Sequence, residues 1–303
     1  MNKLTVESIN KKLIDNPKSF IEECETAYGE KISSIARDVS GKPGRELVML
    51  AGPSSSGKTT TAKMLKYAIE GFGRKAKVVS LDDFYCDQNL IYTFEDGTTD
   101  YETVKALDTK LISECLSSLM ENGSAQMPHF SFQTKKREGF EEMLCDSDEI
   151  IIVEGLHALN PVITDPLEKE SMKKLYVSVS SRIYDEDKVL FSKRDLRFIR
   201  RLIRDYHFRS SEVDFTFYLW KGVRMGEDRY LFPFSGRADE RIDSIHPYEP
   251  SLFKKEAEKL LDLVGEESVY YCTAVSLKEK LNLFHGIDEK QIPADSLLRE
   301  FIG

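Results

Sequence analysis

Residues 52–59 constrain the fold of this chain more than any other segment does, because they read Gly-Pro-Ser-Ser-Ser-Gly-Lys-Thr. They fit the pattern G-x-x-x-x-G-K-[ST], in which a glycine-rich turn between a strand and a helix wraps its backbone N–H groups around phosphate oxygens. The flanking segments agree with that setting, since residues 47–50 are a short apolar run typical of a buried strand and residues 60–69 read as a helix. We therefore predict a phosphate-binding loop (the P-loop) at residues 52–59.

The residue types of the P-loop predict how it works. Gly52 and Gly57 are expected to adopt backbone conformations that a Cβ atom would block. Lys58 is expected to reach the β- and γ-phosphates of a nucleotide, and the Thr59 hydroxyl to coordinate Mg²⁺. The predicted nucleotide-binding set is completed by Ser54, Ser55, Ser56 and Thr60.

The remaining pattern predicts an α/β fold with a parallel sheet that is covered by helices on both faces. Further strands are expected at residues 77–81, 149–153, 175–179 and 269–272, and a helix at residues 104–121. An inserted hairpin is expected over residues 127–142, with its turn at residues 135–139. Residues 1–40 read as helical and end at a Gly- and Pro-containing turn. We therefore predict an N-terminal helical extension at residues 1–45 and a single P-loop domain at residues 46–303.

Composition narrows the classes of partner. The net charge of −9 argues against general binding to nucleic acid or to an anionic membrane surface. No apolar run approaches the length of about 18 residues that a membrane span needs, and the N-terminus lacks the apolar core of a signal peptide. The five cysteines contain no C-x-x-C pair, which is typical of reduced thiols in a cytoplasmic protein. A small-molecule substrate is expected, and a homo-oligomer is left open.

Two acidic residues follow predicted strands directly. Asp82 follows residues 77–81, and Glu154 follows residues 149–153. Ligands of parallel sheets bind at the carboxyl ends of the strands, where the P-loop is also expected. There Asp82 can take the proton of a substrate hydroxyl and help to hold Mg²⁺ through water, although a strand-end Asp can also simply cap a helix. Glu154 is expected to help place Mg²⁺, and Gly155 after it permits a close backbone approach.

A basic stripe is predicted on a helix over residues 193–205. Arg197, Arg200, Arg201 and Arg204 have the spacing i, i+3, i+4, i+7, which places them on one helical face. Like charges on one stripe repel, and a bound triphosphate would supply the missing counter-charge. We therefore predict that this helix is a lid over the nucleotide, whereas a stripe for nucleic acid is the alternative that the net charge disfavours.

Together these residues resemble the uridine kinase and phosphoribulokinase family of P-loop kinases over about residues 45–250. The resemblance is carried by Gly52–Thr61, Asp82-x-Phe84-Tyr85, Ile152–Gly155 and the arginine-rich segment 195–205. Segments 128–137, 223–234, 238–239 and 292–303 are similar to a bacterial uridine-kinase-like branch of the family. Members of that branch often carry an N-terminal TGS domain, which is not expected in this chain.

The resemblance implies a P-loop NTPase fold with a helical lid. It also implies ATP-dependent (or GTP-dependent) phosphorylation of a hydroxyl with Mg²⁺, which in nucleoside kinases is the ribose 5′-hydroxyl. Asp82 would be the general base and Glu154 the acid associated with Mg²⁺. Lys58, Arg197 and Arg201 would act in catalysis, and Arg200 and Arg204 would clamp the nucleotide's phosphates.

The acceptor side departs from the family pattern. Predicted acceptor-binding residues are Asp82, Tyr85, Glu102, Phe130, Lys135 and Arg209. Phe130 and Lys135 align where uridine-cytidine kinases carry a base-reading Tyr and His, and Glu102 is the nearest candidate for the Asp that binds the ribose hydroxyls. The alternatives are a kinase for a non-nucleoside hydroxyl and a regulatory nucleotide-binding protein. A GTPase would carry an N-K-x-D guanine reader, which the sequence does not contain.

Overall fold

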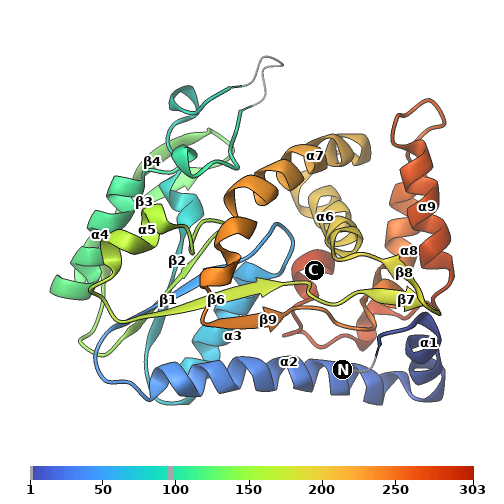
Figure 1. Ribbon diagram of the computed structural model, residues 1–303, viewed down its shortest axis with the longest axis horizontal. Helices are drawn as coiled ribbons and strands as arrows, with labels where there is room; N and C mark the ends of the chain where they lie inside the picture. The colour runs from blue at the N-terminus through green and yellow to red at the C-terminus, as the bar shows by residue number, and fades with distance from the viewer. Residues whose placement is uncertain (1–2, 94–98) are drawn as a thin grey trace.

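The computed structural model describes residues 3–93 and 99–303. At its centre lies a five-stranded sheet in the order β2-β5-β1-β6-β9 (Figure 1). Every pairing in this sheet is parallel, which confirms the predicted α/β fold. Its strands are β1 Glu46–Ala51, β2 Ala76–Ser80, β5 Ile150–Glu154, β6 Met172–Ser178 and β9 Glu240–Asp243.

Helices cover both faces of the sheet. Side chains along a strand alternate between its faces, so one strand contributes to both of the cores under those helices. Val48 and Leu50 of β1 pack into the core under one face, and Leu47 and Met49 pack into the core under the other. The first core includes residues of α2 and α3, and the second includes residues of α4 and α5. The bounds of these helices are α2 Pro17–Ser40, α3 Lys58–Gly71, α4 Thr109–Asn122 and α5 Pro161–Thr164.

The predicted strand at residues 269–272 is wrong. That segment leads into helix α9 (Tyr271–Asn282), and Val269 is 88% exposed, so its β-branched side chain is not used for packing. The fifth strand is β9, a short edge strand that pairs with β6 alone. The predicted helix 104–121 is split, since Val104–Ala106 is a 3-10 turn and α4 begins after the Asp108 side chain accepts a hydrogen bond from the Leu111 N–H.

The inserted hairpin is confirmed, and it consists of β3 (Ser124–Ser131) and β4 (Lys136–Leu144). Its turn comes earlier than predicted, at residues 132–135, where Lys135 has a left-handed φ of 57°. A second, shorter hairpin, β7 (Ile183–Asp185) and β8 (Lys188–Phe191), precedes the arginine-rich helix.

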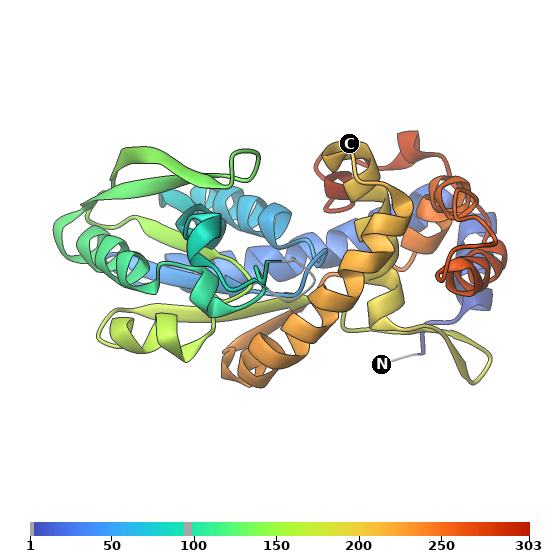
Figure 2. The same cartoon turned by 90° about the horizontal axis from the view of Figure 1, so that it is seen from above.

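A helical part lies to one side of the central sheet, next to the edge strand β9 (Figure 1); Figure 2 shows the same two parts from above. The predicted arginine-rich helix is α6, and the Ser192 and Asp195 side chains form a capping box at its start. The helices of this part are α6 Lys193–Arg209, α7 Val213–Tyr230, α8 Glu249–Leu261, α9 and the short α10 Arg299–Ile302. We call α6 and α7 together the arm, because they lie between the sheet and the other helices in both views.

The N-terminal helices α1 (Val6–Asp15) and α2 confirm the helical prediction for the segment that precedes residue 41. Helix α2 runs along the base of the molecule (Figure 1). The Tyr28 hydroxyl lies 2.7 Å from the Thr61 hydroxyl of α3. The Glu25 carboxylate accepts hydrogen bonds from Tyr248 and from Ser296, and the Asn10 amide donates to the Leu283 carbonyl. Within the described residues, no helix combines the length and the apolar character needed to cross a membrane.

Candidate active site

The P-loop follows β1 at the carboxyl edge of the sheet, where Glu154 ends the neighbouring strand β5. Leu50 is the register partner of Glu154 in β5, and Ser80 is its partner in β2. The Thr59 hydroxyl donates to the Glu154 carboxylate at 3.3 Å, and the Ser80 hydroxyl donates to it at 3.1 Å. The structure therefore brings together the two residues that the sequence assigns to Mg²⁺ most directly.

Both P-loop glycines have a steric reason to be there. A Cβ atom on Gly52 would lie 2.2 Å from the Val177 carbonyl oxygen of β6. Gly57 has a φ of 85°, and a Cβ atom there would lie 2.6 Å from the Leu297 side chain. A Cβ atom on Gly155 would lie 2.7 Å from the Leu81 Cβ, so the close approach that this glycine permits is that of Leu81.

Two buried hydroxyl groups of the P-loop have no partner among the residues that the structure describes. Ser55 has a left-handed φ of 58°. The hydroxyls of Ser55 and Ser56 are buried and, among the described residues, have no hydrogen-bond partner. The Lys58 ammonium donates to the Pro53 carbonyl at 3.3 Å. Buried polar groups normally find partners, so this loop has the chemistry of a site that takes a polar, anionic ligand.

Asp82 and Asp83 lie in a 3-10 turn, Leu81–Phe84, that begins directly after β2. The surrounding protein raises the pKa of Asp82, whereas Lys58 and Arg209 lower it; its side chain nevertheless contacts solvent. The Asp83 carboxylate instead lies 3.5 Å from His129 Nδ1 of the hairpin. The two neighbouring carboxylates therefore have different partners, and Asp82 is the one in the field of the P-loop lysine.

Two further carboxyl groups have strongly raised pKa values. Burial, with a smaller contribution from Asp82, raises the pKa of Glu154 to about 7 against the effects of Lys58 and of its two hydroxyl partners. Burial also raises the pKa of Glu102 to about 7, with a contribution from Glu227, against Arg201 and Lys58. Carboxyl groups with displaced pKa values in the field of one lysine are a feature of functional sites.

The arginine stripe requires a correction. Its counter-charges come from protein carboxylates and not from a ligand alone: Arg197 pairs with Glu227, and Arg200 pairs with Glu249. The Arg200 side chain is fully buried, and it also donates to the Ser244 carbonyl at 2.7 Å. Arg200 Nη1 also lies 3.4 Å from the Ser55 carbonyl oxygen of the P-loop. In this structure Arg200 is therefore held by protein partners, and its contact with phosphate stays a prediction.

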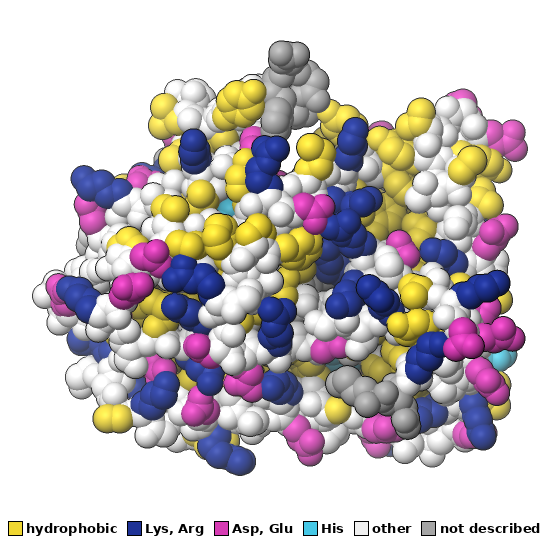
Figure 3. All heavy atoms as spheres, viewed as in Figure 1, with side chains coloured by type: hydrophobic (Ala, Val, Ile, Leu, Met, Phe, Trp, Pro, Cys, Tyr) yellow, Lys and Arg dark blue, Asp and Glu magenta, His cyan; other side chains and the backbone are white. Residues whose placement is uncertain are grey.

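The other arginines surround Asp205 and differ in exposure. Arg201 Nε and Arg204 Nη2 lie 3.0 and 2.8 Å from its carboxylate, and Arg209 Nη1 lies 3.5 Å from it. The Arg209 side chain is 57% exposed, whereas the Arg201 and Arg204 side chains are largely buried. Figure 3 shows Lys and Arg side chains gathered around a hollow between the sheet and the helical part.

Two of the predicted acceptor residues, Tyr85 and Phe130, form an aromatic group with Phe132 of the hairpin. The Tyr85 ring lies 5.6 Å from the rings of Phe130 and Phe132, and its hydroxyl donates to the Tyr101 carbonyl. Phe130 is buried, whereas Phe132 is 57% exposed. Phe130 is thus a packing residue in this structure, and Lys135 lies on the exposed turn of the hairpin.

Sequence reasoning assigned no role to two acidic residues that contact the P-loop region. The Thr60 hydroxyl, predicted to bind nucleotide, donates to Glu300 at 2.7 Å. The Ser54 N–H donates to Glu227 at 2.8 Å. The only signal for either was that both lie in segments similar to the uridine-kinase-like branch.

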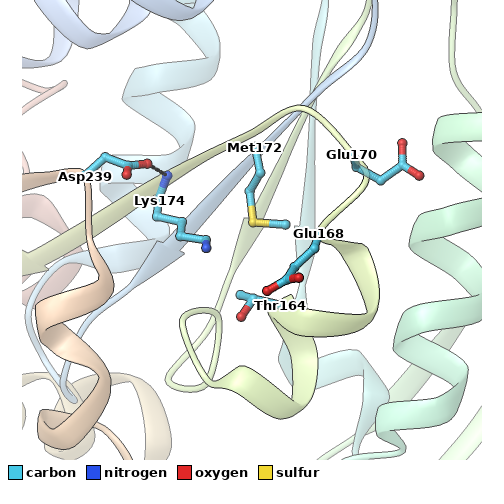
Figure 4. Close-up of a pocket in the computed structure, with 6 residues that line it drawn as sticks. All are labelled: Thr164, Glu168, Glu170, Met172, Lys174 and Asp239. Carbon is cyan, nitrogen blue, oxygen red and sulfur yellow. Dashed lines mark hydrogen bonds between the residues drawn. The ribbon is translucent and has the colours of Figure 1, made fainter.

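A separate pocket lies at the opposite edge of the sheet. It has a volume of 190 Å³ and is lined by Thr164, Glu168, Glu170, Met172, Lys174 and Asp239 (Figure 4). The Lys174 N–H donates to the Asp239 carboxylate at 2.7 Å there. Because Met172 begins β6, this pocket lies at the amino ends of the strands, away from the predicted site residues.

Comparison with known proteins also points to a P-loop kinase. The Phosphoribulokinase / Uridine kinase family model matches residues 47–247, which is more than half of the chain. A uridine kinase from Brevibacillus brevis is 29% identical over 168 residues, covering 55% of this chain and 70% of that protein. A uridine kinase from Staphylococcus aureus is 28% identical over 195 residues, which cover 64% of this chain and 84% of that protein.

A solved structure from Silicibacter sp. TM1040, named for a fructose transport system kinase, has a similar fold. Its TM-score is 0.51 with 19% sequence identity, and the match covers 69% of this chain and 98% of that chain. At this identity the likeness concerns the fold alone.

Proposed function

Since this chain belongs to the Phosphoribulokinase / Uridine kinase family, we propose that it is an ATP-dependent nucleoside kinase that phosphorylates the 5′-hydroxyl of a uridine-like acceptor. Membership makes the chain a P-loop phosphotransferase with an alcohol group as acceptor. The finer assignment of donor, acceptor and residue roles is the proposal.

One observation carries this proposal: Lys58, the Thr59–Glu154 pair and Asp82 meet at one edge of the sheet. Lys58 acts on the pKa values of Asp82 and of Glu154, so its charge reaches both carboxyl groups. A cation beside a phosphate loop can stabilise the charge that develops on a leaving phosphoryl group. A carboxylate in contact with solvent beside that cation can accept the proton of an attacking hydroxyl.

The oxygen atoms at this edge fit Mg²⁺. Mg²⁺ prefers oxygen ligands and usually keeps several waters, so it needs few protein atoms. The Thr59 hydroxyl and the Glu154 carboxylate would hold it, with Asp82 acting through water; among the described residues no cluster of three or more His, Cys, Asp or Glu suits a metal ion. When bound, Mg²⁺ neutralises phosphate charge. The protein groups orient the donor and receive the acceptor's proton.

A second candidate is a kinase for a non-nucleoside hydroxyl, such as that of a sugar or another polyol. It is favoured by Phe130, which is buried and has no polar atom with which to bind a base. Both candidates use the same donor machinery and differ only in the acceptor.

The test is acceptor-dependent release of ADP from MgATP, measured across nucleosides, sugars and polyols. A kinase should release ADP rapidly with one acceptor class and slowly without it. Lys58→Ala serves as the control for contaminating activity. Slow hydrolysis that no acceptor accelerates would contradict the proposal and favour a regulatory nucleotide-binding protein.

A further inference from the structure

A buried ion pair joins the two helices of the arm. Arg197 of α6 donates to Glu227 of α7 through two hydrogen bonds, of 2.6 and 2.7 Å. The two side chains are 3% and 0% exposed. Removing both charges from water is costly, and the cost is offset only when the geometry is good and the remaining polar groups also find partners. The other partners of this pair therefore indicate what it does.

Those partners are the two backbone polar groups of one P-loop residue. The Ser54 N–H donates to Glu227 Oε1 at 2.8 Å, and Arg197 Nη1 donates to the Ser54 carbonyl at 2.9 Å. Arg201 Nη1 donates to the hydroxyl of the same serine at 2.9 Å. The arm thus holds Ser54 at three points.

The residue that follows explains why such a hold is needed. Ser55 has a left-handed φ of 58°, which residues other than glycine keep only where the surroundings fix it. Its buried hydroxyl and that of Ser56 have no partners among the described residues. The loop is thus held open around groups that await a ligand.

We propose that Glu227 is a positioning residue that fixes the P-loop in its phosphate-binding conformation before the nucleotide arrives. The inference rests on the proposed function, in which this loop takes the donor's phosphates. Glu227 carries the same sign of charge as a phosphate, and its two oxygens are bound by Arg197 and Ser54, so it acts through the loop and not on the substrate. A site that is ordered in advance avoids the entropy cost of ordering on binding.

The experiment compares Glu227→Gln with Asp228→Asn. Asp228 is the next residue of α7, and its carboxylate is 53% exposed in a surface pair with Arg194, so it is a matched carboxylate-to-amide control. In the nucleotide-free protein, Glu227→Gln should speed hydrogen exchange of residues 52–57 without a general rise elsewhere. It should also weaken MgATP binding about 10-fold or more, as expected for the loss of hydrogen bonds to a charged group. The KM for the acceptor should change little in Glu227→Gln. In Asp228→Asn, both the exchange of residues 52–57 and the affinity for MgATP should stay close to those of the wild type.

Unchanged exchange in the P-loop would overturn the proposal, and so would tighter MgATP binding, which would mean that the carboxylate competes with phosphate. If Glu227→Gln does not fold, Glu227→Asp keeps the charge but is too short to reach Arg197 and Ser54 together. It should speed loop exchange in the same way, and unchanged exchange would again be contrary. A wild-type protein that binds no nucleoside triphosphate would refute the proposed function separately, because the exchange of the free loop still tests Glu227.

Discussion

The two sides of the site are built differently. On the donor side the phosphate-binding loop is one continuous segment, residues 52–60; the arm holds its backbone at Ser54, and β6 and Leu297 pack closely against its two glycines. The predicted acceptor side is assembled from separate segments that carry Asp82, Glu102 and the hairpin, and the hairpin also carries the exposed Phe132. The contrast separates two tasks. Binding a polyphosphate requires a rigid cradle, whereas selecting an acceptor depends on side chains that can differ between relatives on the same scaffold.

Lys58→Ala should have the largest effect and would test the donor side. The ammonium is expected to act most strongly when charge develops on the transferred phosphoryl group. Turnover should fall by about 10³-fold. Steady-state rates and melting temperature, measured on the same preparation, separate lost catalysis from lost folding. A kcat near that of the wild type would refute the assignment of the phosphate loop.

Asp82→Asn should have the next largest effect, at the boundary between the two sides. It keeps the shape of the side chain and removes the base, so kcat should fall by about 10²-fold with little change in MgATP affinity. Asp83→Asn is the matched control, because that carboxylate lies beside His129. If Asp83→Asn is the more damaging change, the assignment of the base is wrong.

The two sides can also be compared through the pH dependence of stability, since Glu154 lies on the donor side and Glu102 on the predicted acceptor side. Both pKa values are raised to about 7 in the folded protein, above the ordinary value of 4.5, so the folded state holds more protons than the unfolded state between pH 4.5 and 7. The free energy of unfolding should therefore fall as pH rises through that window. Glu154 should account for up to about 3 kcal/mol of this fall, and Glu102 for less, because it is only partly buried and solvent screens it.

Urea unfolding at pH 5 and at pH 7.5 checks this prediction. Glu154→Gln should flatten the pH dependence more than Glu102→Gln does. An equal or steeper pH dependence in Glu154→Gln would contradict the raised pKa of that carboxyl group.

Phe132→Ala should have the smallest effect and would sharpen the acceptor side. The exposed ring lies edge-on to Phe130 at 5.2 Å, and its free surface can pack against a planar acceptor. An aromatic contact of this kind contributes about 0.5–1.5 kcal/mol, so the acceptor KM should rise between about 2-fold and 12-fold. The donor KM should stay unchanged, and a matching rise in both would show that Phe132 only supports the fold.

The sequence was sufficient for the donor side because its signals are local. The spacing of Gly52, Gly57 and Lys58 and the apolar runs on either side specify the loop and its strand. The strand β9 was not predicted because Glu-Arg-Ile-Asp contains a single apolar residue, Ile242. An edge strand can be held with only one buried apolar side chain. Conversely, Val-Tyr-Tyr-Cys at residues 269–272 has the composition of a strand, but it leads into helix α9 and leaves the Val269 side chain exposed.

The arginine stripe shows the limit of reasoning from one element. Its residues and their helix were predicted, but their partners lie far along the chain: Glu227 is 30 residues from Arg197, and Glu249 is 49 residues from Arg200. Helical spacing shows which side chains share a face and not what that face meets. The burial of Arg200 and the role of Glu227 therefore depended on the tertiary structure.

The contacts of the N-terminal helices have a consequence for biosynthesis. Asn10 and Glu25 bind residues that are 273 and 271 positions further along the chain. At a translation rate of about 5–20 residues per second, the ribosome needs roughly 15 to 55 s to deliver those partners. During that interval the apolar side chains of α1 and α2, such as Ile9, Phe20 and Ile32, lack part of their native cover. The first helices to emerge are thus among the last to complete their packing.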